Sequence, residues 1–442
     1  MHSPSSRRLL RPLQLTAVLF FTVSGGPYGL EPVLHYVGGS TALLLIFLLP
    51  LLWCLPAMLM VLELNSMMPV NGGYYQWVKT ALGLKWGFFE GWWSWIFLFV
   101  DLAIYPVLFV QYLAFFFPGV EAYGVIVCLA LVWGAAGLNI LGIVPVGRSS
   151  LVLGVAVLVP FLILFISAMT TRDPLAMAHA GEGFHGVGLT AFAMGMFTVM
   201  WNYLGWDNGS PYAEEVYKPV RSYLVSMVAA FVLIVAMYAM AIYTASTSGI
   251  DSGTLQEQGF PSLGSFVGGW WLGAVVSAGG MASAIGLFLS NLLSVSRIPK
   301  AMADDRLLPA TLTRLHPTYN VPHVSILLCA VVVSGMVLWT FGDLLIIDVT
   351  LYSSALFLEF ISLIALRRRA PDGPRPFRIP LNVAGLVAMT AVPAVCLGAA
   401  LYGLLSTVNI YGSAFLFAIV SILTGPVAWW IVQRRAIFIT RR

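Results

Sequence analysis

Apolar runs recur along almost the whole chain, and short polar or basic stretches separate them. A run of about 20 residues crosses the hydrocarbon core of a bilayer as an α-helix. The alternation of apolar and polar residues that would indicate a membrane β-barrel is absent from the sequence. We therefore predict an all-α integral membrane protein with twelve transmembrane helices, near residues 14–36, 40–66, 84–117, 122–142, 148–170, 189–212, 222–247, 264–296, 323–341, 343–367, 381–406 and 411–433.

Two of these helices contain residues that oppose helix formation. The first holds the stretch SGGPYG at residues 24–29, and the sixth holds LGWDNGSP at residues 204–211. Proline removes a backbone donor and glycine resists helical order, so we predict a break in each helix. Backbone groups freed at bilayer depth are tolerated only where protein or a water-filled cavity satisfies them. Interrupted membrane helices therefore indicate a solute site.

The position of the two breaks predicts an internal repeat. The interrupted helices are the first and the sixth, so the first ten helices form two sets of five. An odd number of spans inverts the second set, which places the two breaks opposite each other at mid-membrane. The predicted organisation is a cytoplasmic tail at 1–13, a first repeat at 14–170, a second, inverted repeat at 189–367, helices 11 and 12 at 381–433, and a cytoplasmic tail at 434–442.

Composition and charge exclude a soluble globular chain and predict an orientation. The chain is 60% hydrophobic and 9% charged, with a mean hydropathy of +0.91. With the N-terminus inside, every lysine and arginine except Arg172 falls on the cytoplasmic side. We predict a multi-pass protein of the plasma or bacterial inner membrane with both termini cytoplasmic. The basic start resembles a signal peptide, but no small-residue cleavage site follows, so the first helix is expected to remain.

Acidic residues inside predicted spans are the strongest site candidates, because buried charge is costly and usually faces a cavity. Asp207 lies in the second break and Asp101 near the middle of the third helix. We predict that both bind substrate, and Asp101 is also a candidate proton carrier. Glu31, after the first break, is a proton-coupling candidate, or else a cation funnel toward the outer end or a helix cap. Glu359, in the tenth helix, is a proton-coupling candidate or a protonated structural acid.

Three further acids have weaker patterns. Glu63 and Glu90 lie near the cytoplasmic ends of their helices, where they would be solvated or paired with Lys79 or Lys85, and a structural role is the favoured interpretation. Asp348 and Tyr352, one turn apart in the tenth helix, would complete the far end of a site for a long substrate.

Backbone and aromatic groups complete the predicted substrate site. The first amides after Gly26 are expected to point unpaired into the cavity, where their partial positive charge suits a carboxylate. In the alternative interpretation the glycines only allow tight helix packing. Aromatic rings at the site would bind an amine by cation–π contact or act as a gate. The predicted substrate residues besides the acids are Ser24, Gly25, Gly26, Tyr28, Gly29, Tyr105, Tyr203, Trp206 and Tyr352.

The coupling ion is open on this reasoning. A sodium site would need carbonyl groups of the first break beside hydroxyl groups of the eighth helix, where Ser290 and Ser294 are available with Ser283. The four cysteines show no metal or disulfide spacing, so no metal site is predicted. We expect no cofactor, and no nucleic-acid partner because the basic residues are spread over short loops.

Several motifs resemble a known family. FFTVSGGPYGLE in the first segment, GGYYQWV after the second helix, GFFEGWWSW and YPVLF in the third, WNYLGWD in the sixth and LFLEF in the tenth resemble the polyamine-uptake permeases of plants and protists. These belong to the amino acid-polyamine-organocation superfamily, which has bacterial amino acid permeases as relatives. The resemblance implies a LeuT-like fold and proton symport. Polyamine carriers of this group tend to have an acid where this chain has Gln111, so amino acids and polyamines both remain open as substrates.

The sequence thus predicts a secondary active transporter of amino acids or polyamines that works by alternating access in the lipid bilayer, with H⁺ as coupling ion. Alternatives are an amino acid exchanger without ion coupling and a nutrient-sensing receptor on the same fold. No Walker motif or constellation of nucleophile, base and metal occurs, so neither an ATP-driven pump nor an enzyme is expected.

Overall fold

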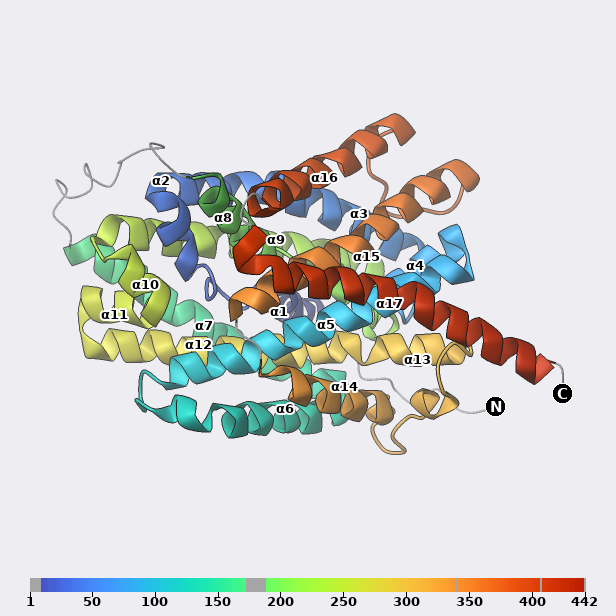
Figure 1. The fold of residues 1–442 in the computed structure, drawn as a ribbon, viewed down its shortest axis with the longest axis horizontal. Helices are drawn as coiled ribbons and strands as arrows, with labels where there is room; N and C mark the ends of the chain where they lie inside the picture. The colour runs from blue at the N-terminus through green and yellow to red at the C-terminus, as the bar shows by residue number, and fades with distance from the viewer. Residues whose placement is uncertain (1–8, 172–187, 339–340, 406–407, 441–442) are drawn as a thin grey trace.

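The computed structural model describes residues 9–171, 188–338, 341–405 and 408–440, and most of its long helices run side by side along one axis (Figure 1). The described residues form no β-strand, only two isolated bridges. Nine described helices are long and apolar enough to cross a membrane, and three shorter apolar helices accompany them. The prediction of an all-α, multi-pass membrane protein is confirmed. Arg7, Arg8, Arg172, Arg441 and Arg442, used for the predicted orientation, lie outside the described residues.

The helices follow the predicted order, with some extra elements. They are α1 (Pro12–Val23), α2 (Glu31–Leu49), α3 (Leu55–Met67), α4 (Gly73–Leu82), α5 (Leu84–Leu113), α6 (Gly124–Ile140), α7 (Ile143–Thr171), α8 (Leu189–Trp201), α9 (Pro219–Ser248), α10 (Ser252–Gln258), α11 (Phe260–Gly268), α12 (Trp270–Val295), α13 (Arg297–Asp304), α14 (His323–Met336), α15 (Phe341–Arg369), α16 (Val383–Leu405) and α17 (Val408–Thr440). A π-helical turn, η1 (Pro50–Cys54), joins α2 to α3, and short 3₁₀ turns are η2 (Val120–Tyr123), η4 (Asp207–Gly209), η5 (Ala213–Glu215) and η6 (Ala310–Thr313).

The first predicted helix is broken where the sequence indicated. Helix α1 ends at Val23 and α2 begins at Glu31. Between them Gly25, Gly26 and Gly29 have φ values of 63°, 108° and 95°, a region that suits glycine and cannot continue an α-helix. Helix α2 then bends at Gly38, whose φ is 71°, and continues toward α3. The bend falls at the predicted boundary between the helices 14–36 and 40–66, although α2 runs through it without a loop.

The second break is longer than predicted. The helix expected at 189–212 ends at Trp201, and the turns η4 and η5 replace its second half. Gly205 has a φ of 89°, and a Cβ atom there would lie 2.7 Å from the carbonyl oxygen of Thr22. A Cβ atom on Gly29 would lie 2.6 Å from the ring of Trp201. Each break therefore packs against the other, and glycine makes the close approach possible.

Some stretches expected as loops are helical, and α4 is the one that bears on the site. Its pattern places Tyr74, Trp77, Val78 and Ala81 on one face, and all four are buried. With 10 residues, α4 is too short to be predicted from the sequence as a transmembrane helix. Helix α4 packs against α5, α15 and η4. It thus covers one end of the second break.

The helices that carry the predicted site residues pack around the two breaks. Helix α12 contacts α1, α5 and α7, and α15 contacts α5 and α8. Apolar side chains of α7 that face outward, such as Val152 and Ile166, are exposed, as expected for a surface that contacts lipid.

Candidate functional site

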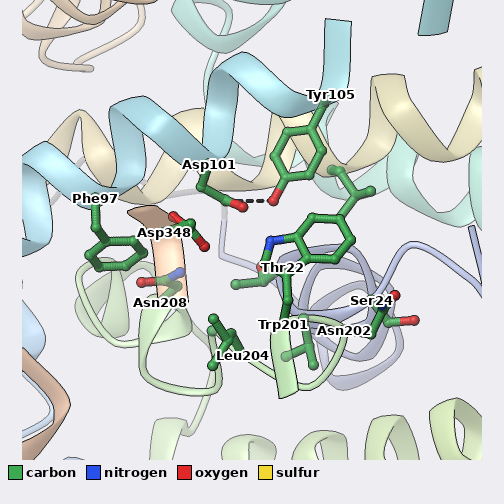
Figure 2. Close-up of a pocket in the computed structure, with 13 residues that line it drawn as sticks. Thr22, Ser24, Phe97, Asp101, Tyr105, Trp201, Asn202, Leu204, Asn208 and Asp348 are labelled. Atoms are coloured by element: carbon green, nitrogen blue, oxygen red, sulfur yellow. Dashed lines mark hydrogen bonds between the residues drawn. The ribbon is translucent and has the colours of Figure 1, made fainter. Parts of the chain in front are cut away.

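A small cavity lies where the two breaks meet (Figure 2). Its walls are the end of α1 (residues 22–24), three side chains of α5, the second break from Trp201 to Asn208, and one side chain each from α12 and α15. The volume available to the centre of a water molecule is about 20 Å³. That is room for about one water molecule.

Asp101 is the anionic group that α5 contributes to the cavity. Its Oδ2 accepts a hydrogen bond from the hydroxyl of Tyr105, one helical turn further along α5. The amide of Asn291 on α12 donates to the same hydroxyl at 3.0 Å. The indole of Trp201 lies beside the Asp101 carboxylate (Figure 2). Asp101 is therefore oriented by neutral groups from three helices.

Asp348 on α15 is the second carboxylate of the cavity. Its side chain lies on the same side of the cavity as Asp101 (Figure 2). It is 1% exposed, and its Oδ1 has no hydrogen-bond partner among the described residues. Neither Asp101 nor Asp348 forms an ion pair within the described ranges. Two buried carboxylates without a cationic partner favour binding of a cation.

The structure places some predicted substrate residues at the cavity and others directly behind it. Ser24, Asp101 and Tyr105 line it. Tyr352 packs its ring on the cavity residue Phe97, with ring centroids 5.1 Å apart. The Tyr352 hydroxyl donates to Asp207 at 2.6 Å, so Asp207 faces away from the cavity toward α15.

The remaining predicted substrate residues do not line the cavity. A Cβ atom on Gly25 would lie 2.6 Å from Leu287, and one on Gly26 would lie 2.6 Å from Val157. Their contact with substrate, like that of Gly29, Tyr28, Tyr203 and Trp206, stays a prediction. The hydroxyls of Tyr28 and Tyr203 donate to the carbonyls of Val276 and Ile46 at 2.6 and 3.1 Å, and the ring of Trp206 lies 6.1 Å from that of Phe231.

Of the amides after Gly26, which were expected to be unpaired, those of Gly29 and Leu30 are paired, and so are the amides of Gly25 and Gly26 before them. The Gly25 amide donates to the carbonyl of Phe20 at 2.9 Å, and the Gly26 amide donates to Ser24 Oγ at 3.0 Å. The amide of Gly29 donates to Glu31 at 2.5 Å. These amides are therefore already satisfied within the protein.

Glu31 holds the break to the neighbouring helices. Besides Gly29, its carboxylate accepts from the Tyr112 hydroxyl at 2.9 Å and from the Phe260 amide at 3.4 Å. Glu31 is the first residue of α2, and no side-chain hydrogen bond caps that helix, so the helix-cap alternative is wrong. Its proton-coupling role stays a prediction.

Ser290 and Ser294, the predicted hydroxyl groups of α12, are fully buried, and neither hydroxyl has a hydrogen-bond partner in the described chain. Ser283 shares this property, and its Oγ would lie 2.8 Å from a Cβ atom on Gly25. The hydroxyl of Ser283 therefore lies beside the first break. An ion site there stays a prediction.

The predicted pairing of Glu63 and Glu90 with lysines is wrong. Lys79 pairs with Asp305 at 2.6 Å. Glu63 is indeed in an ion pair, but with Arg367 at 2.5 Å and Arg375 at 3.2 Å. Glu90 is fully buried, and its Oε1 accepts from Ser94 at 3.0 Å. The sequence did not show this because the true partners lie far away along the chain.

The cavity residues Asn202 and Asn208 were not singled out from the sequence. They lie in the second break, where helical periodicity ends and no spacing indicates which side chains face inward. The only available signal was their place in a stretch rich in glycine and aromatic residues.

Two interrupted helices that meet at an acid-lined cavity define the class of multi-pass helical membrane transport proteins. The sequence model of the family described as "Amino acid permease" matches residues 10–432. The chain therefore belongs to the amino acid permease family, as the motifs indicated, and it is a transporter rather than an enzyme.

Three of the similar proteins are named for two kinds of substrate, polyamines and amino acids. The chain is 31% identical to "Polyamine transporter RMV1" of Arabidopsis thaliana, over 87% of this chain and 79% of that protein. It is 31% identical to "Polyamine transporter PUT1" of Oryza sativa subsp. japonica, over 98% of this chain and 79% of that protein. It is also 22% identical to "Serine/threonine exchanger SteT" of Bacillus subtilis (strain 168), over 83% of this chain and 85% of that protein.

Proposed function

We propose that the protein is a secondary active transporter of polyamines, driven by protons and working by alternating access. The observation that carries the substrate choice is the pair of buried, unpaired carboxylates, Asp101 and Asp348, at one cavity. The polyamine transporters among its relatives support the same choice.

Charge balance favours a polyamine over an amino acid. A diamine brings two positive charges, which would neutralise the two carboxylates. A zwitterionic amino acid would bring a third carboxylate into a buried space, where unpaired charge is costly. The amides of Gly25, Gly26 and Gly29, which could have received that carboxylate, are already bonded. The neutral end of the cavity at Ser24 and Asn202 suits the alkyl chain of a polyamine.

Gln111 has little weight against this choice. Its side chain is exposed, and it is not part of the cavity wall. Replacing an acid by glutamine there therefore leaves the charge of the cavity unchanged.

A cavity with room for about one water molecule cannot hold an amine substrate without rearrangement. Movement of the second break would enlarge it, because Trp201, Asn202 and Asn208 form one wall. We propose that this movement accompanies the rocking of one helix bundle against the rest, within twelve helices that contain an inverted five-helix repeat. Both termini would be cytoplasmic, in a plasma or bacterial inner membrane.

The experiment is uptake by proteoliposomes that contain the full chain. Labelled putrescine is offered alone and with an excess of unlabelled spermidine, serine or threonine. Saturable uptake that spermidine inhibits and the amino acids do not would support the proposal. Uptake of serine or threonine with no uptake of putrescine would overturn it in favour of an amino acid exchanger.

The site is tested by Asp348→Asn, with Asp304→Asn as the matched control because Asp304 is exposed and pairs only with Lys300 in the described chain. We expect Asp348→Asn to weaken putrescine binding by about tenfold or more, since hydrogen bonds to charged groups contribute about 1.5–3 kcal/mol. Equal affinity in the two variants would remove Asp348 from the site.

A further inference from the structure

A second buried acidic cluster lies behind the cavity, and the substrate site does not use it. It consists of Glu90 on α5, Asp207 in η4 and Glu359 on α15. Glu90 and Glu359 are fully buried and Asp207 is 2% exposed. The cluster is distinct from the Asp101 and Asp348 pair, because none of its members lines the cavity.

The cluster has fewer hydrogen-bond donors than its oxygens require. Ser94 donates to Glu90 and Tyr352 donates to Asp207. Oε2 of Glu90 and both carboxylate oxygens of Glu359 have no hydrogen-bond partner among the described residues. None of the three acids forms an ion pair within the described ranges.

Tyr74 is a fourth buried polar group beside the three acids, and it comes from another helix. Its side chain on α4 is fully buried and lies near all three acids, and its hydroxyl forms no hydrogen bond within the described chain. The titratable groups around the three acids are thus Tyr74 from α4 and Tyr352 from α15. Glu63 on the neighbouring α3 is instead held by Arg367.

Three unpaired carboxylates cannot all be ionised at this depth, because each would carry the full desolvation cost of a buried charge. Asp207 and Glu359 lie beside each other, and two carboxyl groups can hydrogen-bond only when one of them carries a proton. Groups this close bind and release protons as one unit. The cluster can therefore bind a proton and release it again.

Hydrogen bonds connect the cluster to residues 205–211, the part of the second break that we propose to move. Tyr352 links Asp207 to the amide of Gly205 in the cavity wall. On the other side, the Tyr74 amide donates to Ser210 Oγ at 3.2 Å, and the Gly72 amide donates to the carbonyl of Pro211 at 2.9 Å. Any movement of residues 205–211 therefore changes the surroundings of the acids.

We propose that Glu90, Asp207 and Glu359 carry the coupling proton, at a site separate from the amine-binding pair Asp101 and Asp348. When residues 205–211 separate from α4, water reaches the cluster and the proton leaves. This inference rests on the proposed polyamine transport, and it assigns coupling to Glu90, for which the sequence suggested only structural pairing.

The test separates proton-driven accumulation from exchange. Proteoliposomes with the membrane potential held at zero receive an inward gradient of one pH unit, and putrescine accumulation is followed together with internal pH. One proton per substrate sustains an accumulation ratio of about tenfold at such a gradient. Counterflow of labelled against unlabelled putrescine at equal pH is measured in parallel, since exchange needs no net proton movement.

We expect Glu359→Gln and Glu90→Gln each to lower the accumulation ratio to about one while counterflow continues, because the amide cannot store a proton. Continued counterflow also shows that the variant is folded. Glu257→Gln, at an exposed acid of α10, is the matched control and should accumulate putrescine like the unchanged protein.

Full accumulation by both cluster variants would overturn the inference while leaving polyamine transport intact. Loss of both accumulation and counterflow in a variant with an unchanged melting temperature would also overturn it, because the cluster would then act in substrate movement itself. Absence of putrescine transport by the unchanged protein in both assays would instead contradict the proposed function.

Discussion

The hydroxyl of Tyr352 donates a 2.6 Å hydrogen bond to Oδ1 of Asp207 and accepts one of 3.3 Å from the amide of Gly205. One side chain of α15 thus holds both the backbone and the acid of the second break. Because all three groups are buried, the bonds have no competition from bulk water. This relationship ties the position of the break to α15.

We predict that Tyr352→Phe destabilises the protein and impairs transport. The change leaves Asp207 Oδ1 and the Gly205 amide without their partner, and an unsatisfied buried polar group costs about 1–3 kcal/mol. The melting temperature in detergent should fall, and putrescine uptake should slow. Tyr402→Phe is the control, because Tyr402 is 70% exposed. Identical melting temperatures for the two variants would show that the bond to Asp207 contributes no stability.

We predict that Gly205→Ala abolishes transport. Gly205 has a φ of 89°, where a side chain is strained, and its Cβ atom would lie 2.7 Å from the carbonyl oxygen of Thr22. The two breaks would have to separate to admit the methyl group. Gly134→Ala on α6 is the matched control, because nothing lies within 4 Å of a Cβ atom there and alanine favours a helix. Normal uptake by Gly205→Ala would mean that close contact between the breaks is dispensable.

The sequence predicted where the helices break but not how far the breaks extend. Pro27 and the glycines beside it exclude an α-helix locally, so the first break could be placed to within a residue. The second break was expected inside a helix ending at residue 212, yet α8 ends at Trp201 and 3₁₀ turns follow. Loss of the 3.6-residue period there turned Asp207 toward α15 and left Asn208 at the cavity.

The partners of charged residues were the least predictable feature. Lys79 was expected to pair with Glu63 or Glu90, acids near it in sequence, but it pairs with Asp305, 226 positions away. Local spacing carries no information about a contact that tertiary packing alone creates. The same limitation hid the cluster around Glu90, whose members come from α5, η4 and α15.

We predict that Arg297→Lys weakens the contact with Glu215 and makes the cavity more accessible from the side of the molecule that we assign to the cytoplasm. Arg297 binds Glu215 through Nε at 3.0 Å and through a second nitrogen at 3.3 Å, and the carbonyl of Glu215 accepts from the Leu10 amide at 3.0 Å. Lysine cannot reproduce a two-pronged contact. A cysteine placed at Ser24 should then react faster with a thiol reagent applied from the cytoplasmic side.

The control for this prediction is Lys300→Gln, which removes the more exposed pair with Asp304. Exposed ion pairs contribute little, so the reaction rate at position 24 should remain unchanged. Equal rates in Arg297→Lys and Lys300→Gln would show that the Arg297–Glu215 pair does not limit access to position 24 from the cytoplasmic side.

We predict that Glu63→Gln weakens folding rather than substrate recognition. Glu63 is fully buried on α3, where it binds Arg367 through both oxygens at 2.5 and 2.6 Å and accepts from the Ile379 amide at 2.9 Å. Breaking a buried ion pair costs about 3–5 kcal/mol, because the remaining charge stays desolvated. The melting temperature should drop well below that of Glu257→Gln, while the concentration of putrescine that half-saturates uptake by the folded fraction stays constant. A shift of that concentration with no loss of stability would place Glu63 in the transport pathway instead, since a structural pair outside the cavity has no contact through which to alter affinity.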